Sequence, residues 1–412
     1  MSTHAMNGGK TTGGGLSKSR LGRLHDCMAG YVARGEVPGL VTLVSRRGET
    51  QVNTIGAKTL GGDPMRRDTI FRIASMTKPV TAAAAMILVE ECNLRLDDPV
   101  DRWLPELANR RVLTRLDSPL DDTVPSVRPI TLRDLLTFRL GSGIVMARPG
   151  TYPIQKGIDE VLRGLAPPHP QSPPAPDEWI RRFGALPLLH QPGERWTYHI
   201  GSDVLGVLVA RAAGKPLDVF LRERIFEPLG MKDTGFSVPT AQIDRLATSY
   251  AADPATGGLT VYDSAVGGDW AKPPAFPAGG GGLVSTVDDY LAFAQMLLHY
   301  GKVGAERILS RPSVELMTAD HLTREQKALS GLTAGYFDSH GWGFGVSIVT
   351  RRDDVAGSIG TYGWNGGLGT TWTSDPCEQM ITILLTQRAF TSPVPPDVCL
   401  DFATMAYQSI DD

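Results

Sequence analysis

The chain has 412 residues, 42% of them hydrophobic and 21% charged, and its formal net charge is −3. This composition is ordinary for a globular protein and the length is sufficient for two packed lobes. Because there is no block of like charges and no run of roughly 20 apolar residues, we expect neither a nucleic-acid nor a membrane partner.

The N-terminal part of the chain predicts a tail, a helix and a hairpin. Residues 1–15 are rich in Gly, Thr and Ser and are expected to form a disordered tail. They contain no apolar segment typical of a signal peptide, so we expect the protein to be cytoplasmic. A helix is predicted over residues 16–34. Residues 40–45 and 51–55 predict the two strands of a β-hairpin.

The next segment contains a candidate nucleophile, Ser75. Lys78 follows three residues later, so on a helix both side chains lie on one face, one turn apart. Residues 69–74 have extended character and residues 80–91 are strongly helical, which places Ser75 at a helix N-terminus with positive potential. A serine in such a place is commonly only an N-cap, and a first-turn lysine is commonly solvated. The catalytic interpretation therefore needs partners elsewhere.

The middle of the chain, residues 97–330, is predicted to be mostly helices and loops. Residues 166–177 contain six prolines and predict a stiff loop. Four consecutive glycines, residues 279–282, permit close approach of the backbone to other groups. The helices expected in this part are residues 132–137, 203–213, 218–226 and 287–299.

The last part of the chain returns to strands. Strands are predicted over residues 342–349, 369–374 and 380–386, and a final helix over residues 396–407. Since strands occur at both ends of the chain, the simplest packing joins them in one sheet. We therefore expect an α/β lobe made of residues 16–96 and 331–412, with residues 97–330 as a mostly helical lobe.

A tyrosine can complete the candidate chemistry of Ser75. Tyr198 lies on a predicted loop directly before a helix, although a tyrosine beside Trp196 also fits a core role. Tyr262, on another loop, is the rival. The chain has no G-x-S-x-G motif and its eight histidines are scattered, so no sequence motif supports a Ser-His-Asp triad. In the alternative chemistry, a lysine and a tyrosine act as the base, and burial of Lys78 would lower its pKa for that role.

A glycine-rich strand edge near residues 362–367 is the third candidate element. Gly366 and Gly367 allow a ligand to approach the backbone and expose N–H donors for an oxyanion. A hairpin turn or a bulge is an equally good interpretation of these glycines alone.

Together these segments resemble the serine β-lactamase-like superfamily, which includes class C β-lactamases, DD-peptidases and family VIII carboxylesterases. Residues 71–78 match the nucleophile motif of that superfamily, and further matches are residues 97–100, 131–137, 227–231 and 281–286. The resemblance implies a β-lactamase-like α+β or α/β fold with an antiparallel sheet. It also implies catalytic roles for Ser75, Lys78 and Tyr198.

Two departures from the penicillin-processing members bear on the substrate. The Y-x-N motif keeps Tyr198 but has the apolar Ile200 in place of asparagine. At the third element, Trp364 stands where those members carry a lysine or histidine, as in family VIII esterases and related acyltransferases. A cation there would attract a carboxylate, whereas Trp364 offers a neutral wall suited to an ester.

These features predict a serine hydrolase that cleaves small carboxylic esters through an acyl-Ser75 intermediate. Backbone N–H groups of Ser75 and Gly367 are expected to hold the oxyanion, with Trp364 and Gly366 at the substrate. The alternatives are acyl transfer, a β-lactamase or D-amino-acid peptidase, and a non-catalytic ligand-binding protein. Because no C-x-x-C pair or histidine cluster occurs, we expect no metal, and we expect no cofactor.

Overall fold

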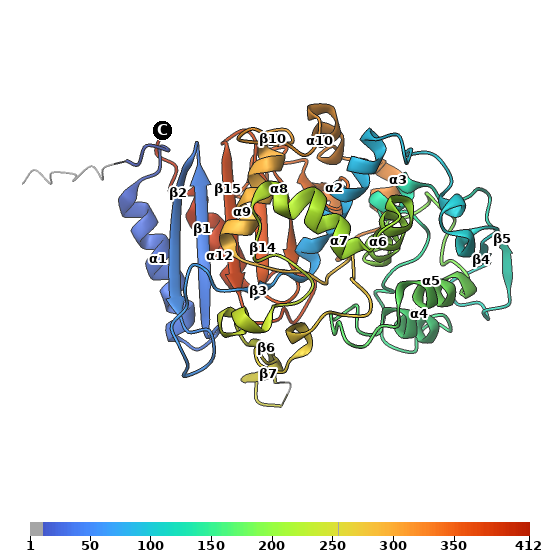
Figure 1. The fold of residues 1–412 in the computed structure, drawn as a ribbon, viewed down its shortest axis with the longest axis horizontal. Coiled ribbons are helices and arrows are strands. Elements are labelled where there is room, and N and C mark those ends of the chain that lie inside the picture. The colour runs from blue at the N-terminus through green and yellow to red at the C-terminus, as the bar shows by residue number, and fades with distance from the viewer. Residues whose placement is uncertain (1–10, 254) are drawn as a thin grey trace, which may run out of the picture.

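The computed structural model describes residues 11–253 and 255–412, and its centre is a seven-stranded antiparallel sheet (Figure 1). The strand order is β11-β12-β13-β14-β15-β1-β2. Strand β1 pairs with β15, with Leu40 opposite Thr386, so both ends of the chain build the sheet. The expected fold class is thereby confirmed. The strands are β1 (Gly39–Arg46), β2 (Glu49–Gly56), β11 (His340–Trp342), β12 (Ser347–Val349), β13 (Tyr362–Gly366), β14 (Thr370–Asp375) and β15 (Met380–Thr386).

Helices cover both faces of this sheet. Successive residues of a strand point to opposite faces. Leu40 and Val44 of β1 accordingly pack into one apolar cluster and Val41 and Leu43 into another. This two-sided burial explains why β15 is a nearly continuous apolar run. Two helices cover one face and a third covers the other (Figure 1), with bounds α1 (Lys18–Ala33), α12 (Asp397–Tyr407) and α9 (Val287–Leu298).

The remaining helices lie mostly to one side of the sheet (Figure 1). Val41 of β1 and Leu205 of α6 belong to the same apolar cluster, so the sheet and these helices share one core. The division into residues 16–96 with 331–412 and residues 97–330 stays a prediction. The bounds are α2 (Thr77–Glu90), α3 (Leu132–Leu136), α4 (Gln155–Leu162), α5 (Pro176–Ala185), α6 (Ile200–Ala213), α7 (Leu217–Leu221), α8 (Glu227–Leu229), α10 (Arg311–Met317) and α11 (Arg324–Ala328).

Two predicted elements differ from the structure. Residues 342–349 form the end of β11 and all of β12 rather than one strand, because the chain turns between them. Gly343 N donates to Val346 O at 2.8 Å, and Gly345 has a φ of 73°. The helix predicted over residues 218–226 changes from α-helical to π-helical hydrogen bonding at Arg222. Short paired strands complete the fold: β3 (Phe71–Arg72) with β8 (Val284–Ser285), β4 (Arg111–Leu113) with β5 (Thr123–Pro125), β6 (Ser249–Ala252) with β7 (Leu259–Asp263), and β9 (Lys302–Val303) with β10 (Glu306–Arg307).

The predicted disordered tail, residues 1–15, lies largely outside the described residues. Residues 11–15 are instead held against the first hairpin. Gly14 N donates to Glu49 Oε2 at 2.7 Å, and Arg46 Nη1 donates to Gly14 O at 2.9 Å. The expectation of disorder is therefore wrong for these five residues.

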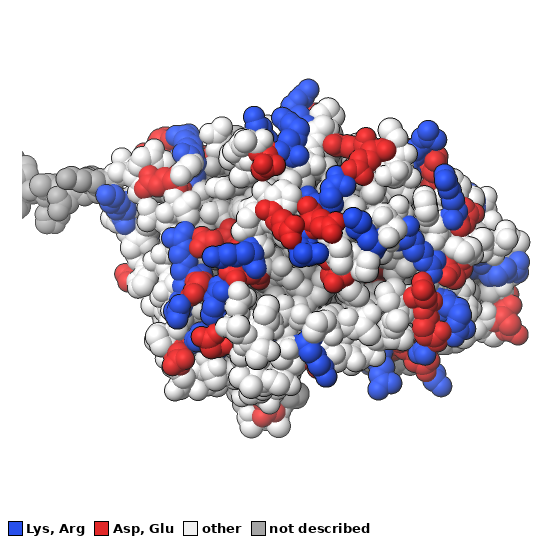
Figure 2. All heavy atoms as spheres, in the orientation of Figure 1, with Lys and Arg blue, Asp and Glu red and all other residues white. Residues whose placement is uncertain are grey.

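The surface carries charges of both signs. Lysine and arginine side chains alternate with aspartate and glutamate over the face that Figure 2 shows. No helix in the described part of the chain combines the length and the apolar character needed to cross a membrane.

Candidate active site

Ser75 lies where β3 passes into α2. A short 3-10 turn, Ala74–Met76, joins the two elements, and Ala74 has a φ of 43°, which is uncommon for a residue with a side chain. The turn leaves Ser75 partly exposed at the start of a helix whose next residues are buried. The structure thus places Ser75 at the helix N-terminus, as the sequence predicts.

Lys78 is fully buried and faces Ser75. Its Nζ lies 3.0 Å from Ser75 Oγ and donates a hydrogen bond to the Gly280 carbonyl. Burial lowers the pKa of Lys78 to about 7, although the charge of Asp203 opposes this shift. An amine with this pKa is substantially neutral near pH 7 and carries a lone pair that can accept a proton.

Tyr198 approaches Lys78 from the loop that precedes α6. Lys78 Nζ lies 4.8 Å from the centre of the Tyr198 ring. The Tyr198 hydroxyl accepts a hydrogen bond of 2.9 Å from Trp364 Nε1. Burial raises the pKa of Tyr198 to about 12, even though hydrogen bonds with Ser75 and Trp364 lower it. Tyr198 is therefore a protonated phenol at neutral pH.

The glycine-rich edge of β13 lies against the segment that precedes Ser75. A Cβ atom on Gly366 would lie 2.2 Å from Ile73 O, so only glycine fits there. Thr370 Oγ1 donates to the same carbonyl at 3.3 Å. Gly367 follows in the turn, where a Cβ atom would meet nothing within 4 Å. The structure thus places the turn that contains Gly366 and Gly367 beside the Ser75 segment.

Tyr262, the rival of Tyr198, makes different contacts. Its hydroxyl donates to Pro168 O at 2.6 Å, and its ring centroid lies 4.8 Å from that of His169. The residues in contact with Ser75 and Lys78 thus include Tyr198 and not Tyr262.

Sequence reasoning missed two side chains and one carbonyl at Lys78. His199 Nδ1 is 3.4 Å from Lys78 Nζ, and Asp203 accepts a 2.8 Å hydrogen bond from Gly280 N. The spacing of residues 199 and 203, four apart at the start of α6, indicates that these two side chains can pair, but it does not point to Lys78. The four-glycine run does permit close approach: a Cβ atom on Gly279 would lie 2.5 Å from Ser202 O.

A hollow of about 160 Å³ adjoins Tyr198. Met146 and Leu329 at its rim are about half exposed. Polar groups reach it through Arg195 and Ser330. Its apolar side chains belong to Leu116, Ile144, Val145, Met146, Leu189, Trp196 and Leu329.

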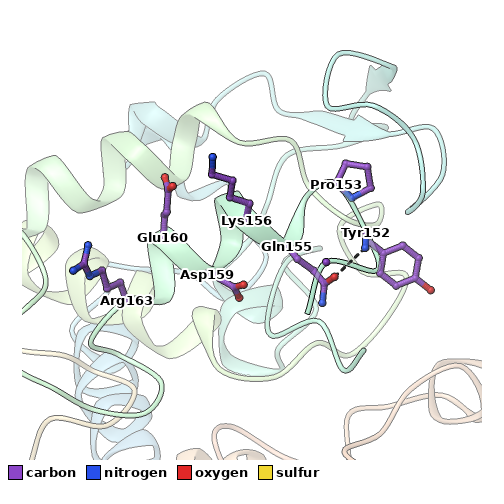
Figure 3. A pocket seen from close by; sticks show the side chains of 8 residues that line it. Tyr152, Pro153, Gln155, Lys156, Asp159, Glu160 and Arg163 are labelled. Carbon is purple, nitrogen blue, oxygen red and sulfur yellow. Dashed lines mark hydrogen bonds between the residues drawn. The ribbon is translucent and has the colours of Figure 1, made fainter. Parts of the chain in front are cut away.

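A larger hollow, of about 510 Å³, lies along α4 and the loop before it (Figure 3). Gln155 Oε1 accepts a hydrogen bond of 2.9 Å from Tyr152 N at one end. Charged side chains of α4, including Lys156 and Glu160, extend along it. Because its lining residues share none with the Ser75 site, we do not place a substrate there.

Comparisons with known proteins identify the family of this chain. The family model described as Beta-lactamase matches residues 24–398. Protein Rv1367c of Mycobacterium tuberculosis is 42% identical over 376 residues, which are 90% of this chain and 89% of that protein. Esterase EstB of Burkholderia gladioli is 33% identical and aligns over 85% of this chain and 86% of its own. The solved structure of EstCE1, "a hydrolase with promiscuous acyltransferase activity", has a TM-score of 0.77 at 26% identity and covers 95% of this chain and 99% of its own. The chain therefore belongs to the beta-lactamase family, and the relatives named here include an esterase and a hydrolase that also transfers acyl groups.

Proposed function

We propose that the protein is a serine hydrolase that cleaves small, uncharged carboxylic esters through an acyl-Ser75 intermediate. One observation carries the proposal: a buried lysine with a pKa of about 7 lies 3.0 Å from the hydroxyl of a partly exposed serine. A ligand-binding protein would have no use for a buried amine at this cost, which disfavours the non-catalytic alternative.

In the proposed mechanism, the neutral Lys78 amine accepts the Ser75 proton as Oγ attacks the ester carbonyl carbon. The carbonyl oxygen becomes an oxyanion, which the backbone N–H groups of Ser75 and Gly367 stabilise. The C–O bond to the alcohol then breaks, and the departing oxygen takes a proton. Water then attacks the acyl carbon and gives one proton to the neutral Lys78 amine. The bond from the acyl carbon to Ser75 Oγ breaks, Lys78 returns the proton to Oγ, and the acid is released.

The two candidate proton carriers differ in role. With its pKa near 12, Tyr198 stays protonated at neutral pH, so Lys78 rather than a tyrosinate is the base. Trp364 Nε1 donates to the Tyr198 oxygen, which leaves the Tyr198 proton free to be donated. Tyr198 thus passes a proton to the departing alcohol and is recharged by protonated Lys78.

The surroundings of Tyr198 support an uncharged substrate. Trp364 is buried in a cluster of aromatic side chains and offers no cation to a carboxylate. The neighbouring hollow offers apolar side chains that can contact an acyl or alcohol group, beside polar side chains that include Arg195. The neutral indole of Trp364 favours an ester over a penicillin or a peptide C-terminus.

Transfer of the acyl group to an alcohol is the second candidate activity. It uses the same acyl-Ser75 intermediate, with an alcohol hydroxyl in place of water. The structural similarity to EstCE1 supports it, since that protein is a hydrolase with promiscuous acyltransferase activity.

The test compares p-nitrophenyl butyrate with nitrocefin in the wild type and in Trp364→Lys. We expect the wild type to have the higher kcat/KM on the ester. The substitution shifts the ratio of the two kcat/KM values toward nitrocefin by about tenfold, because one charge-assisted hydrogen bond contributes about 1.5–3 kcal/mol at most. A wild type that prefers nitrocefin would contradict the esterase proposal in favour of a β-lactamase.

A further inference from the structure

His199 lies between Lys78 and Asp203 in the interior. Its Nδ1 is 3.4 Å from Lys78 Nζ, and its Nε2 is 3.2 Å from Asp203 Oδ2. The backbone of His199 has a φ of 89° and a ψ of −68°, a γ-turn conformation that is strained for any residue with a side chain. Strained residues of this kind persist only where the surrounding structure holds them, and they cluster at functional sites.

The tautomer of His199 follows from its neighbours. Burial, and then the charge of Lys78, lower the pKa of His199, so its imidazole is neutral near pH 7 with one bare nitrogen. His199 Nε2 and Asp203 Oδ2 do not meet hydrogen-bond geometry, yet neither has another partner among the described residues. A carboxylate accepts and does not donate, so the imidazole proton belongs on Nε2. The bare Nδ1 then faces Lys78.

The hydrogens of Lys78 can now be assigned. A neutral amine has two N–H bonds and one lone pair, and three groups surround Nζ: Gly280 O, His199 Nδ1 and Ser75 Oγ. The carbonyl oxygen and the bare nitrogen can only accept, so they take the two hydrogens. The lone pair is left pointing at the Ser75 hydroxyl.

Asp203 connects both acceptors of Lys78. Its Oδ1 accepts the 2.8 Å hydrogen bond from Gly280 N, and its Oδ2 faces His199. The Asp203 side chain is fully buried. One carboxylate therefore fixes the Gly280 peptide and the His199 ring together.

We propose that His199, held by Asp203, is a positioning residue that directs the Lys78 lone pair at Ser75. This inference rests on the proposed roles of Ser75 and Lys78. It assigns to residue 199 a polar contact with the lysine, in a chain where the Y-x-N asparagine is replaced by Ile200.

The first test compares His199→Leu with His199→Asn. Leucine keeps the bulk and removes the acceptor, whereas the branch of asparagine can present an oxygen near the place of Nδ1. We expect His199→Leu to lower kcat for p-nitrophenyl butyrate on the order of 10- to 100-fold with KM within about twofold. His199→Asn should restore most of the loss. Equal kcat values in wild type, His199→Leu and His199→Asn would overturn the proposal.

The second test is the pH profile of Asp203→Asn. The titratable groups that face Lys78 are Tyr198, His199 and Asp203, and the Asp203 charge alone raises the pKa of Lys78. Without that charge, the acidic limb of kcat/KM moves to lower pH, by about half a unit or more. The new amide donates to Nε2, drives the imidazole proton to Nδ1 and so lowers kcat on the plateau.

Asp375→Asn is the matched control. Asp375 is also a buried carboxylate that accepts a backbone N–H, from Ser358 at 2.9 Å, but it contacts Tyr407 rather than Lys78. We expect both aspartate variants to lower the unfolding temperature and only Asp203→Asn to move the acidic limb. An unmoved limb in Asp203→Asn, or an equal shift in Asp375→Asn, would overturn the role of Asp203.

A third readout does not depend on turnover. The ¹⁵N NMR spectrum of the histidines, with His199 assigned from its loss in His199→Leu, reports the tautomer directly. We expect a bare Nδ1 and a protonated Nε2 at pH 7, and a protonated Nδ1 would overturn the inference. If instead ester hydrolysis survives Ser75→Ala, the proposed function fails while this tautomer still stands on its own measurement.

Discussion

Trp364 Nε1 donates a hydrogen bond of 2.9 Å to the hydroxyl oxygen of Tyr198. This bond joins the neutral wall of the proposed substrate site to the proposed proton carrier. In the proposed mechanism it also gives Trp364 a part in the chemistry, beyond the choice of substrate class that the sequence predicts. Because the indole N–H of Trp364 is used in this bond, the hydroxyl hydrogen of Tyr198 is the one left for donation.

Trp364→Phe should lower kcat on p-nitrophenyl butyrate about 3- to 10-fold, because one neutral hydrogen bond contributes about 0.5–1.5 kcal/mol. Trp342→Phe is the matched control. Trp342 belongs to the same aromatic cluster, and its Nε1 is buried without a hydrogen-bond partner among the described residues. Steady-state kinetics of both variants check this, and an equal loss in the control would assign the effect to packing.

Lys78 and Tyr198 should act as one unit. Lys78→Ala and Tyr198→Phe are each expected to lower kcat/KM on the order of 10²- to 10⁴-fold. Because both serve one proton path, the double variant should be little worse than the worse single variant. If the fold-loss of kcat/KM in the double variant equals the product of the two single fold-losses, the two residues act independently.

The pH–rate profile should follow the protonation of Lys78. Since the neutral amine is the active form, kcat/KM rises about tenfold per pH unit below pH 7 and levels off above the pKa of about 7. A flat profile from pH 5 to 8 with full activity at pH 5 would exclude Lys78 as the base.

The same pKa shift has a consequence for stability. The native Lys78 loses its proton at about 7, whereas the unfolded lysine keeps it up to the ordinary value of 10.5. The unfolded state therefore binds more protons between these values, and the free energy of unfolding rises with pH across that window. Urea unfolding at pH 7 and pH 9 should show a smaller rise in Lys78→Met than in the wild type. An equal rise of the unfolding free energy in Lys78→Met and in the wild type would contradict the lowered pKa of Lys78.

Gly366 and Gly367 should respond oppositely to alanine. A Cβ atom at Gly366 would meet the Ile73 carbonyl at 2.2 Å, which forces the turn away from the Ser75 segment. Gly366→Ala should therefore lose most activity, whereas Gly367→Ala, with open space around it, should fold normally and keep its melting temperature. Circular dichroism and ester kinetics of the two variants give the comparison. Full activity in Gly366→Ala would contradict the close packing of Gly366 against the Ile73 carbonyl.

Local patterns sufficed for much of the fold. The apolar run of β15 and the helix that begins beside Ser75 depend on residues close in sequence, and the structure contains both. The turn at Gly345 inside the predicted strand was not foreseen. Gly345 has a φ of 73°, which favours glycine, and a Cβ atom there would also lie 3.0 Å from Lys78 O, so both the turn and the packing against a distant segment require this glycine.

The candidate site was predictable only in part for the same reason. Ser75 and Lys78 form a motif within one helical turn, so their spacing alone indicated a contact. His199 contacts a lysine 121 positions away, and the Gly280 carbonyl reaches the same lysine from 202 positions away. Such contacts arise from tertiary packing, and an isolated histidine before a helix gives no sign of them.

The central claim, that Ser75 becomes acylated by an ester, is tested most directly by intact-protein mass spectrometry after brief incubation with p-nitrophenyl butyrate. Peptide mapping then locates the added mass. The account predicts a butyryl group on Ser75 in the wild type, lost on longer incubation, and no such group in a folded Ser75→Ala variant. A wild type that hydrolyses the ester while Ser75→Ala keeps near-normal turnover, or an acyl group on another residue, would contradict it.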